Sequence, residues 1–409
     1  MTTTAPDQQL QDELDAFVRG DERIDRHQLF ERLRHDAPVI HNEQLGAWVV
    51  SRYEDVKGIL ADEDRFATLR EGPGAPVYGP AMLQWRGREH QKKGGIVARR
   101  LRSKKAVGEA DDFVHGVARD LAEKLVARDG PVDLKTDYAM WIPLLVIGEL
   151  LDVDGAERFR DWYHDISAGG VSSIGHPEKR ERAFEALAQL GDFLDPIITE
   201  RRESPGDDLL SDLCTATYDD EPLPFEQIRA MTAFLLTAGV ETTERALSSL
   251  FVYLFREPSR WQELRERPEM VTAACAETLR VFPPVHAVTR MALEDVEVQG
   301  VTIHEGDRLV PLLASGNRDE TVFDDPHTFR LDRFADDAER QFTNAGYTLP
   351  FGAGRHHCTG SQLARIEMVH GIDELLTRIR SASFVGEVPR PEGFLLVSPG
   401  AVPVTLELD

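Results

Sequence analysis

The chain has 409 residues, of which 41% are hydrophobic and 29% are charged, and its formal net charge is −25. This balance is that of an ordinary globular protein and excludes an intrinsically disordered chain. The negative charge also argues against sequence-independent nucleic-acid binding, which needs a surplus of Lys and Arg.

The N-terminal part of the chain predicts short helices followed by a hairpin. Residues 1–36 are polar and are predicted to contain one or two short helices. Alternating segments at 39–40 and 47–50, with Gly46 between them, are typical of a β-hairpin. A loop rich in Gly and Pro follows at 71–80, and long loops of this kind often line binding sites.

From residue 108 to 282 helical periodicity dominates, and short β-like runs return after residue 294. The clearest helical segments are 137–151, 182–201 and 224–256, the β-like runs are 296–301, 309–313 and 395–406, and one more helix begins near Ser361. The pattern predicts a mainly α fold with small, mostly antiparallel β regions near each end. It does not predict a parallel-sheet nucleotide-binding domain. We expect a single domain over residues 1–409, since length is only a soft guide to domain count and does not force a split.

The sequence also bears on compartment and cysteine chemistry. The first forty residues lack the basic and apolar regions of a signal peptide, and no later run is apolar enough to span a bilayer. We therefore expect a cytoplasmic protein without a membrane partner. Cys214, Cys275 and Cys358 are odd in number and widely spaced, which argues against a disulfide framework.

One segment, residues 86–105, departs from the acidic composition. Its basic residues are Arg86, Arg88, Lys92, Lys93, Arg99, Arg100, Arg102, Lys104 and Lys105. They are opposed only by Glu89. We call this stretch the basic segment. It suits an acidic protein partner, and the alternative is ordinary surface charge.

Residues 351–360 read F-G-A-G-R-H-H-C-T-G and precede an amphipathic helix. We call these ten residues the cysteine loop. Its glycines, Gly352, Gly354 and Gly360, permit positive φ angles and close approach to a flat ligand. Backbone amides and the helix start favour a thiolate at Cys358. The alternatives are a buried structural cysteine, or a zinc or copper site formed with His356 and His357.

Two helical motifs lie upstream of this loop. The apolar run 231–254 contains A-G-V-E-T-T at its centre, where glycine costs about 1 kcal/mol relative to alanine. The Thr242 hydroxyl can bond the carbonyl four residues back. This motif could equally be a packed helix with a solvent-facing Glu241. Further on, Glu277 and Arg280 share one helix face, and alone this pair is weak evidence of function.

The spacing F-G-x-G-x-H-x-C-x-G resembles the haem-binding loop of the cytochrome P-450 family, and every fixed position is present. The resemblance implies a haem b (iron protoporphyrin IX) sandwiched between two helices, with Cys358 as the thiolate ligand that promotes O–O cleavage. The other implied haem contacts are Phe351, Gly352, Gly360 and Ala238.

The remaining motifs fit the same family. A-G-V-E-T-T resembles the oxygen-binding helix, in which Glu241 and Thr242 would deliver protons. Glu277 and Arg280 would brace the cysteine loop with Arg333 as a third partner. The implied propionate ligands are His90, Arg290 and His356. The family often has H-x-x-x-R at the early helix, but this chain has Gly94 at the arginine position. Lys92, Lys93 or Arg86 could compensate.

The resemblance implies a monooxygenase that inserts one atom of O₂ into a hydrophobic small molecule. The expected outcome is hydroxylation in secondary metabolism or catabolism. Electrons would come from ferredoxin and its reductase, docking near Arg99, Arg100 and Arg102. Substrate contacts are expected from the loop 71–84, from helices near 160–195, and from Phe234, Leu235, Val285, His286, Val288 and Leu395. The alternative is a non-catalytic haem-thiolate gas sensor, which would not need Glu241 and Thr242.

Overall fold

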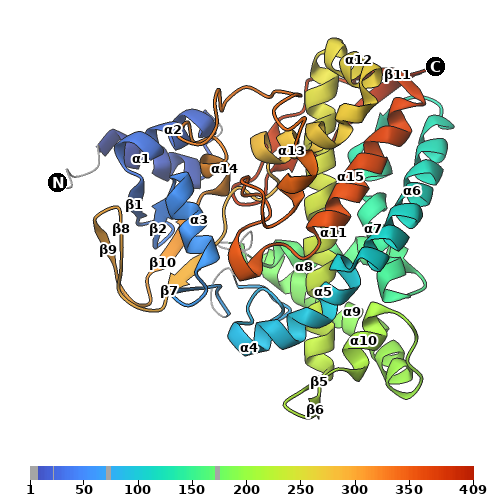
Figure 1. The fold of residues 1–409 in the computed structure, drawn as a ribbon, viewed down its shortest axis with the longest axis horizontal. Helices are drawn as coiled ribbons and strands as arrows, with labels where there is room; N and C mark the ends of the chain where they lie inside the picture. Colours follow the sequence, from blue (N-terminus) through green and yellow to red (C-terminus); the bar gives the residue numbers. More distant parts are fainter. Residues whose placement is uncertain (1–7, 22, 71–74, 171–175) are drawn as a thin grey trace. The chain divides into compact units, whose positions relative to one another are not determined.

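The computed structural model of the chain describes residues 8–21, 23–70, 75–170 and 176–409 (Figure 1). The chain forms two compact units. The first comprises Met1–Leu69, Ala276–Cys358 and Pro391–Ser398, and the second comprises Arg70–Cys275, Thr359–Arg390 and Pro399–Asp409.

The first unit is built on a five-stranded sheet with the strand order β1-β2-β10-β7-β3. The strands are β1 (Val39–Asn42), β2 (Ala47–Val50), β10 (Arg308–Pro311), β7 (Arg290–Ala292) and β3 (Phe66–Ala67). The β1–β2 hairpin is the one predicted from sequence. β10 pairs with β2 in parallel, whereas the other pairs are antiparallel.

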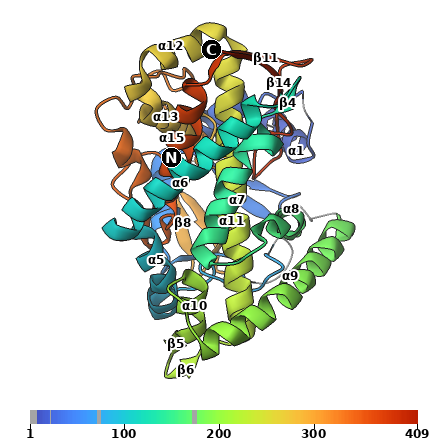
Figure 2. The ribbon, with the colours of Figure 1, turned by 90° about the vertical axis from the view of Figure 1, so that its right-hand side faces the viewer.

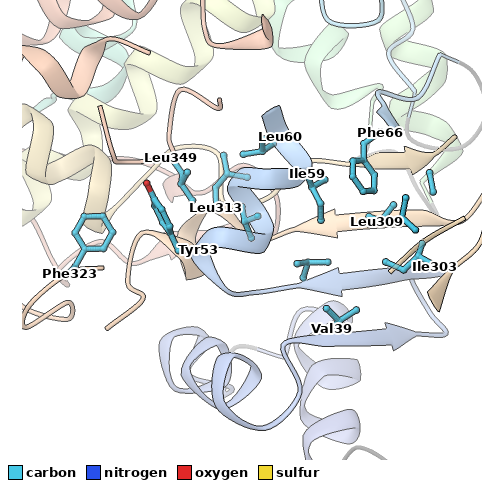
Figure 3. Close-up of a cluster of buried hydrophobic side chains, with 14 residues drawn as sticks. Val39, Tyr53, Ile59, Leu60, Phe66, Ile303, Leu309, Leu313, Phe323 and Leu349 are labelled. Atoms are coloured by element: carbon cyan, nitrogen blue, oxygen red, sulfur yellow. The ribbon is translucent and has the colours of Figure 1, made fainter. Parts of the chain in front are cut away.

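Helices cover both faces of this sheet. Val39 and Leu309 belong to the buried cluster that includes α3, which Figure 3 shows lying over the strands. Their sequence neighbours Ile40 and Val310 belong to the other cluster, with α1 and α2. These helices are α1 (Gln8–Val18), α2 (Arg26–Asp36) and α3 (Tyr53–Ala61). The alternation follows from the two-residue period of side chains along a strand.

Two C-terminal β predictions differ from the structure in detail. The run 296–301 was expected to be one extended segment, but it contains a hairpin between β8 (Val296–Val298) and β9 (Val301–Ile303). Gln299 and Gly300 both have positive φ, 52° and 76°, as a tight hairpin turn requires. The run 309–313 ends as a strand at Pro311 and continues into α14 (Leu313–Gly316).

The second unit is helical and is organised around α11 (Phe225–Arg256), which contacts α7, α8, α9 and α15 (Figure 2). Its other helices include α4 (Gly87–Glu89), α5 (Gly95–Arg102), α6 (Lys104–Val126), α7 (Trp141–Leu151), α8 (Phe159–Ala168), α9 (Pro177–Glu203), α10 (Leu209–Thr215), α12 (Pro258–Glu266) and α15 (Ser361–Leu376). Helix α13 (Val271–Val281) crosses from this unit into the first.

Small antiparallel pairings complete the second unit. β14 (Pro403–Leu408) pairs with β11 (Ile379–Phe384) and β4 (Val132–Asp133), and β5 (Thr217–Tyr218) pairs with β6 (Glu221–Pro222). The fold is therefore mainly α with small antiparallel β regions, as the sequence predicts. Among the described residues, no helix combines the length and apolarity needed to cross a membrane.

Candidate functional site

The cysteine loop presents Cys358 as an exposed thiol outside any disulfide. Its backbone N–H donates to the Phe351 carbonyl at 2.8 Å, which closes the loop. Gly352 and Gly354 have φ angles of 72° and 70°, so these two positions require glycine. Gly360 differs from the expectation, because its φ is −87° and its backbone would suit any residue.

The zinc or copper alternative is not supported at Cys358. Within the described residues, Cys358 is not part of any group of three His, Cys, Asp or Glu side chains close enough to share an ion. A structural zinc site needs four such ligands in tetrahedral array. The exposure of the thiol also disagrees with a buried structural cysteine.

Glu277 and Arg280 on α13 form a bidentate ion pair with both N–O distances at 2.7 Å, and both side chains are fully buried. Arg333 adds a third contact, with Nε 3.0 Å from Glu277 Oε1. The two guanidinium groups also donate to backbone carbonyls of residues 317–328. The sequence therefore correctly grouped three side chains that lie up to 56 positions apart.

Arg290 on β7 is a buried cation, 7% exposed, and burial lowers its pKa to about 10. Its guanidinium donates to the Thr289 carbonyl at 2.9 Å. Among the described residues, no carboxylate lies within ion-pair distance of it. A buried, uncompensated guanidinium is costly, and an acidic group such as a haem propionate would satisfy it.

The other two expected propionate ligands lie in different units. His356 in the first unit has Nε2 3.0 Å from Glu63 Oε2. His90 in the second unit begins a π-helical turn, His90–Gly94. A Cβ at Gly94 would come within 3.3 Å of Met82 and 3.4 Å of His90. A longer residue at position 94 would therefore crowd this turn.

Lys93 was one candidate to replace the missing arginine at Gly94. Its ammonium is buried and bound to Glu89 at 2.9 Å and Gln227 at 2.8 Å. It also lies over the Tyr218 ring at 4.5 Å. The Lys93 ammonium is thus already bound by Glu89 and Gln227. It therefore does not replace the arginine that the family often has at position 94.

Helix α11 is largely buried, and we call the face that carries Phe234, Ala238 and Thr242 its open stripe. From Ile228 to Phe255 of the described helix, only Ala238 is exposed. Phe234, Gly239 and Thr242 beside it are partly exposed. Positions 234, 238 and 242 are four residues apart and share one face. The small side chains of Ala238 and Thr242 allow a planar cofactor to approach the helix at this stripe.

Glu241 and Thr242 of α11 have different hydrogen-bond partners: Glu241 is bound by other side chains, and Thr242 by the backbone of its own helix. Glu241 is 6% exposed, lies 2.5 Å from Arg245, and accepts from the Ser167 hydroxyl on α8. Thr242 donates to the Ala238 carbonyl at 2.7 Å, as expected from the sequence. Glu241 therefore does not face solvent, contrary to the alternative for this motif.

Two residues near α11 were not singled out from the sequence. Tyr78 lies in the described part of the loop 71–84. Its ring packs edge-on against the Phe234 ring, with the ring centroids 6.3 Å apart, and its hydroxyl is hydrogen-bonded to Thr237. Residues 71–74 of that loop lie outside the described residues. Glu367 on α15 is 2% exposed, and burial raises its pKa to about 8 despite a hydrogen bond with Thr243. An aromatic residue in a Gly/Pro-rich loop could have signalled Tyr78, whereas nothing local signals Glu367.

The remaining substrate candidates divide between two clusters of the first unit. Val285 and Val288 pack against the cluster that includes α3, whereas Leu395 packs against the cluster that includes α1 and α2. The His286 ring is buried beside Arg26 of α2, with Nδ1 3.4 Å from the guanidinium. On α11, Leu235 is buried next to the open stripe.

The basic segment carries fewer free charges than its sequence suggests. Arg100 binds Asp212 of α10 at 2.6 Å and Asp207 at 2.8 Å, and these partners raise its pKa. Arg99 and Arg102 are exposed on α5.

Comparisons with known proteins agree with this geometry. A family model described as cytochrome P-450 matches residues 173–401. Nocardicin C N-oxygenase from Nocardia uniformis subsp. tsuyamanensis is 34% identical, covering 93% of this chain and 96% of that protein. Mycinamicin IV hydroxylase/epoxidase from Micromonospora griseorubida is 32% identical, covering 88% of this chain and 89% of that protein.

Solved structures show the same fold. A Bacillus megaterium cytochrome P-450 in complex with testosterone superposes with a TM-score of 0.83 at 26% identity, covering 94% of this chain and 98% of that one. A mutant of the cytochrome P-450 EryK in complex with erythromycin B gives a TM-score of 0.80 at 26% identity and covers 97% of each chain. The chain therefore belongs to the cytochrome P-450 family and is a haem-containing monooxygenase of the bacterial type.

Proposed function

We propose that residues 1–409 form one catalytic domain that holds haem b through Cys358 and inserts one oxygen atom from O₂ into a hydrophobic small molecule. The observation that carries the proposal is the open stripe of α11, on which the small side chains of Ala238 and Thr242 are exposed or partly exposed while most of the helix is buried. When bound, the haem supplies reductive activation of O₂ opposite a thiolate ligand.

Arg290 and His356 would bind the haem propionates, and His90 would add a third contact. Arg290 is the best supported, because it is buried without a carboxylate partner in the described part of the chain. Phe351, Gly352 and Gly360 of the cysteine loop and Ala238 of the open stripe would contact the ring. Glu277, Arg280 and Arg333 would hold the chain between α13 and the cysteine loop in place.

Glu241 and Thr242 would move protons to the site of oxygen activation. The Thr242 hydroxyl donates its hydrogen bond to the Ala238 carbonyl. The lone pairs of the hydroxyl oxygen therefore remain available to accept a hydrogen bond. The Glu241 carboxylate would pass protons toward Thr242. Its position is fixed by the ion pair with Arg245 and by the hydrogen bond that it accepts from the Ser167 hydroxyl.

Phe234, Leu235, Val285 and Val288, with Tyr78 from the loop, would contact the substrate. These side chains are mostly apolar, which supports a hydrophobic substrate, and hydroxylation in secondary metabolism or catabolism is the proposed outcome. The relatives' oxygenase and hydroxylase names support catalysis over a gas sensor. His286 and Leu395 are left out, because their side chains pack toward α1 and α2.

Electrons would arrive from ferredoxin and its reductase, with the acidic ferredoxin docking at the basic segment. Arg99 and Arg102 are the exposed cations that suit this role. Arg100 would contribute less, because two carboxylates already neutralise it.

The absorption spectrum of the reduced, carbon-monoxide-bound protein tests the proposal. We expect the strongly red-shifted Soret band that a thiolate ligand produces. A haem-loaded protein without this band would overturn the assignment of Cys358. Spin-state shifts across a library of hydrophobic compounds would then identify the substrate class.

A further inference from the structure

Glu63 contacts the cysteine loop from the segment that follows α3. Its Oε1 accepts from Arg355 Nη1 at 2.5 Å, and its Oε2 lies 3.0 Å from His356 Nε2. One carboxylate thus binds Arg355 and lies within ion-pair distance of His356, the two basic side chains of the turn Gly354–His356. These two residues are separated from Glu63 by nearly three hundred positions.

The backbones of the two segments also fit closely. A Cβ at Gly354 would lie 2.7 Å from Ala61 Cα and 2.8 Å from the Ala61 carbonyl oxygen, so only glycine allows this approach. The turn carrying Glu63 is itself hydrogen-bonded, because Asp62 donates to Gly58 and Phe66 donates to Asp62. Glu63 therefore projects from a fixed backbone onto a loop that lies against it.

The two partners of Glu63 differ in burial. The Arg355 side chain is 64% exposed, so this pair is screened by solvent and contributes little. Glu63 and His356 are 6% and 11% exposed, so their pair is largely shielded from water. The contact with His356 is the one through which Glu63 can act.

We infer that Glu63 is a positioning residue for the haem site, which acts through His356 to fix the turn that carries Cys358. The inference rests on the proposed function, because it assumes that Cys358 binds the haem iron. Removing a carboxylate that orients a metal-ligating histidine typically changes metal affinity or activity by about 10- to 100-fold, and because His356 would contact a propionate and not the iron, we take the low end of this range as the upper limit. The brace formed by Glu277 lies in another part of the same unit, so Glu63 supplies a separate restraint.

The test compares haem-loaded Glu63→Ala and Glu63→Gln with Asp64→Asn, a matched loss of negative charge at the exposed neighbouring position. The readouts are the rate of haem transfer to apomyoglobin, the fraction of protein without the red-shifted Soret band in the reduced carbon-monoxide spectrum, and the reduction potential. We expect Glu63→Ala to lose haem up to about 10-fold faster and to show a larger fraction without the red-shifted band. Glu63→Gln should be intermediate, because its amide can accept only one of the two contacts.

The reduction potential separates positioning from general stabilisation. Glu63→Gln removes a buried negative charge, so the potential should become more positive, whereas Asp64→Asn removes a charge that solvent screens. Arg355→Ala should change haem loss less than Glu63→Ala does.

Two outcomes contradict the inference. In one, both Glu63 variants match Asp64→Asn in haem loss, spectrum and potential. In the other, they lower only the urea midpoint of unfolding, so that Glu63 is part of the fold and not of the haem site. A wild-type protein without the red-shifted band would instead refute the proposed function, and the two failures are therefore distinguishable.

Discussion

Glu367 gives a quantitative prediction, because its carboxyl is buried on α15 without a cationic partner in the described part of the chain. Burial raises its pKa from an ordinary 4.5 to about 8, although a hydrogen bond with Thr243 of α11 opposes the shift. The carboxyl is therefore protonated in the folded protein at neutral pH. Replacing Glu367 with Gln keeps its size and an oxygen acceptor for Thr243, and it removes the ionisation.

The sign and size of the effect follow from linkage. The folded-state pKa lies above the unfolded one, so the contribution of the neutral acid is fully present below about pH 4.5 and is lost as pH rises through about 8. Each unit of difference between the unfolded-state and folded-state pKa corresponds to about 1.4 kcal/mol of unfolding free energy. The total that Glu367 can contribute therefore has an upper limit of about 5 kcal/mol. Between pH 6 and pH 8.5 the expected loss is about 2 to 3 kcal/mol.

Urea unfolding of the haem-loaded proteins at these two pH values measures the difference. The stability of Glu367→Gln relative to the wild type should rise by about 2 to 3 kcal/mol from pH 6 to pH 8.5. Glu387→Gln, at an exposed position after β11, is the control and should show no such rise. An equal difference at both pH values would mean that Glu367 titrates normally and that its burial costs little.

Three further predictions concern the proposed roles. Glu277→Ala leaves Arg280 buried and unpaired, so we expect a loss of about 3 to 5 kcal/mol in stability and no haem incorporation, and a purified variant with full haem content would contradict the brace. Thr242→Ala should reduce coupled substrate oxidation about 100-fold while O₂ consumption continues, and unchanged coupling, measured as product per O₂, would refute the proton-delivery role. The double reversal of Arg99 and Arg102 to Glu should raise the ferredoxin concentration needed for half-maximal reduction and leave spectral substrate binding intact. Arg100→Glu should instead lower the thermal midpoint, because it breaks the ion pairs to Asp207 and Asp212.

The sequence predicted most where chemistry and local structure coincide. The cysteine loop carries its glycines, its thiol and the following helix within a few residues, so the pattern alone indicated the site. The Glu277–Arg280 pair was found for the same reason, since the two residues are one helical turn apart. The β1–β2 hairpin also follows from a local alternation with a turn residue between the strands.

Contacts between distant segments could not be predicted from local patterns, and Arg333 was grouped with Glu277 only through the family resemblance. Nothing near Glu63 indicates that it meets His356, and nothing in α15 indicates that Glu367 lies buried against α11. The 296–303 hairpin was missed because Gln299, at positive φ, gives no turn signal comparable to glycine. Gly94 has a partial explanation in the structure, because Met82 leaves little room for a side chain there.

The open stripe of α11 also bears on engineering. Most of this helix is packed on every side, so substitutions along it would carry the usual cost of disturbing a core. Phe234 and Ala238 lie outside that constraint, since neither is fully buried. A saturation library at Phe234 should therefore change which compounds the enzyme accepts while most variants still fold and take up cofactor, with Ala238 kept because a larger side chain there would meet the haem ring.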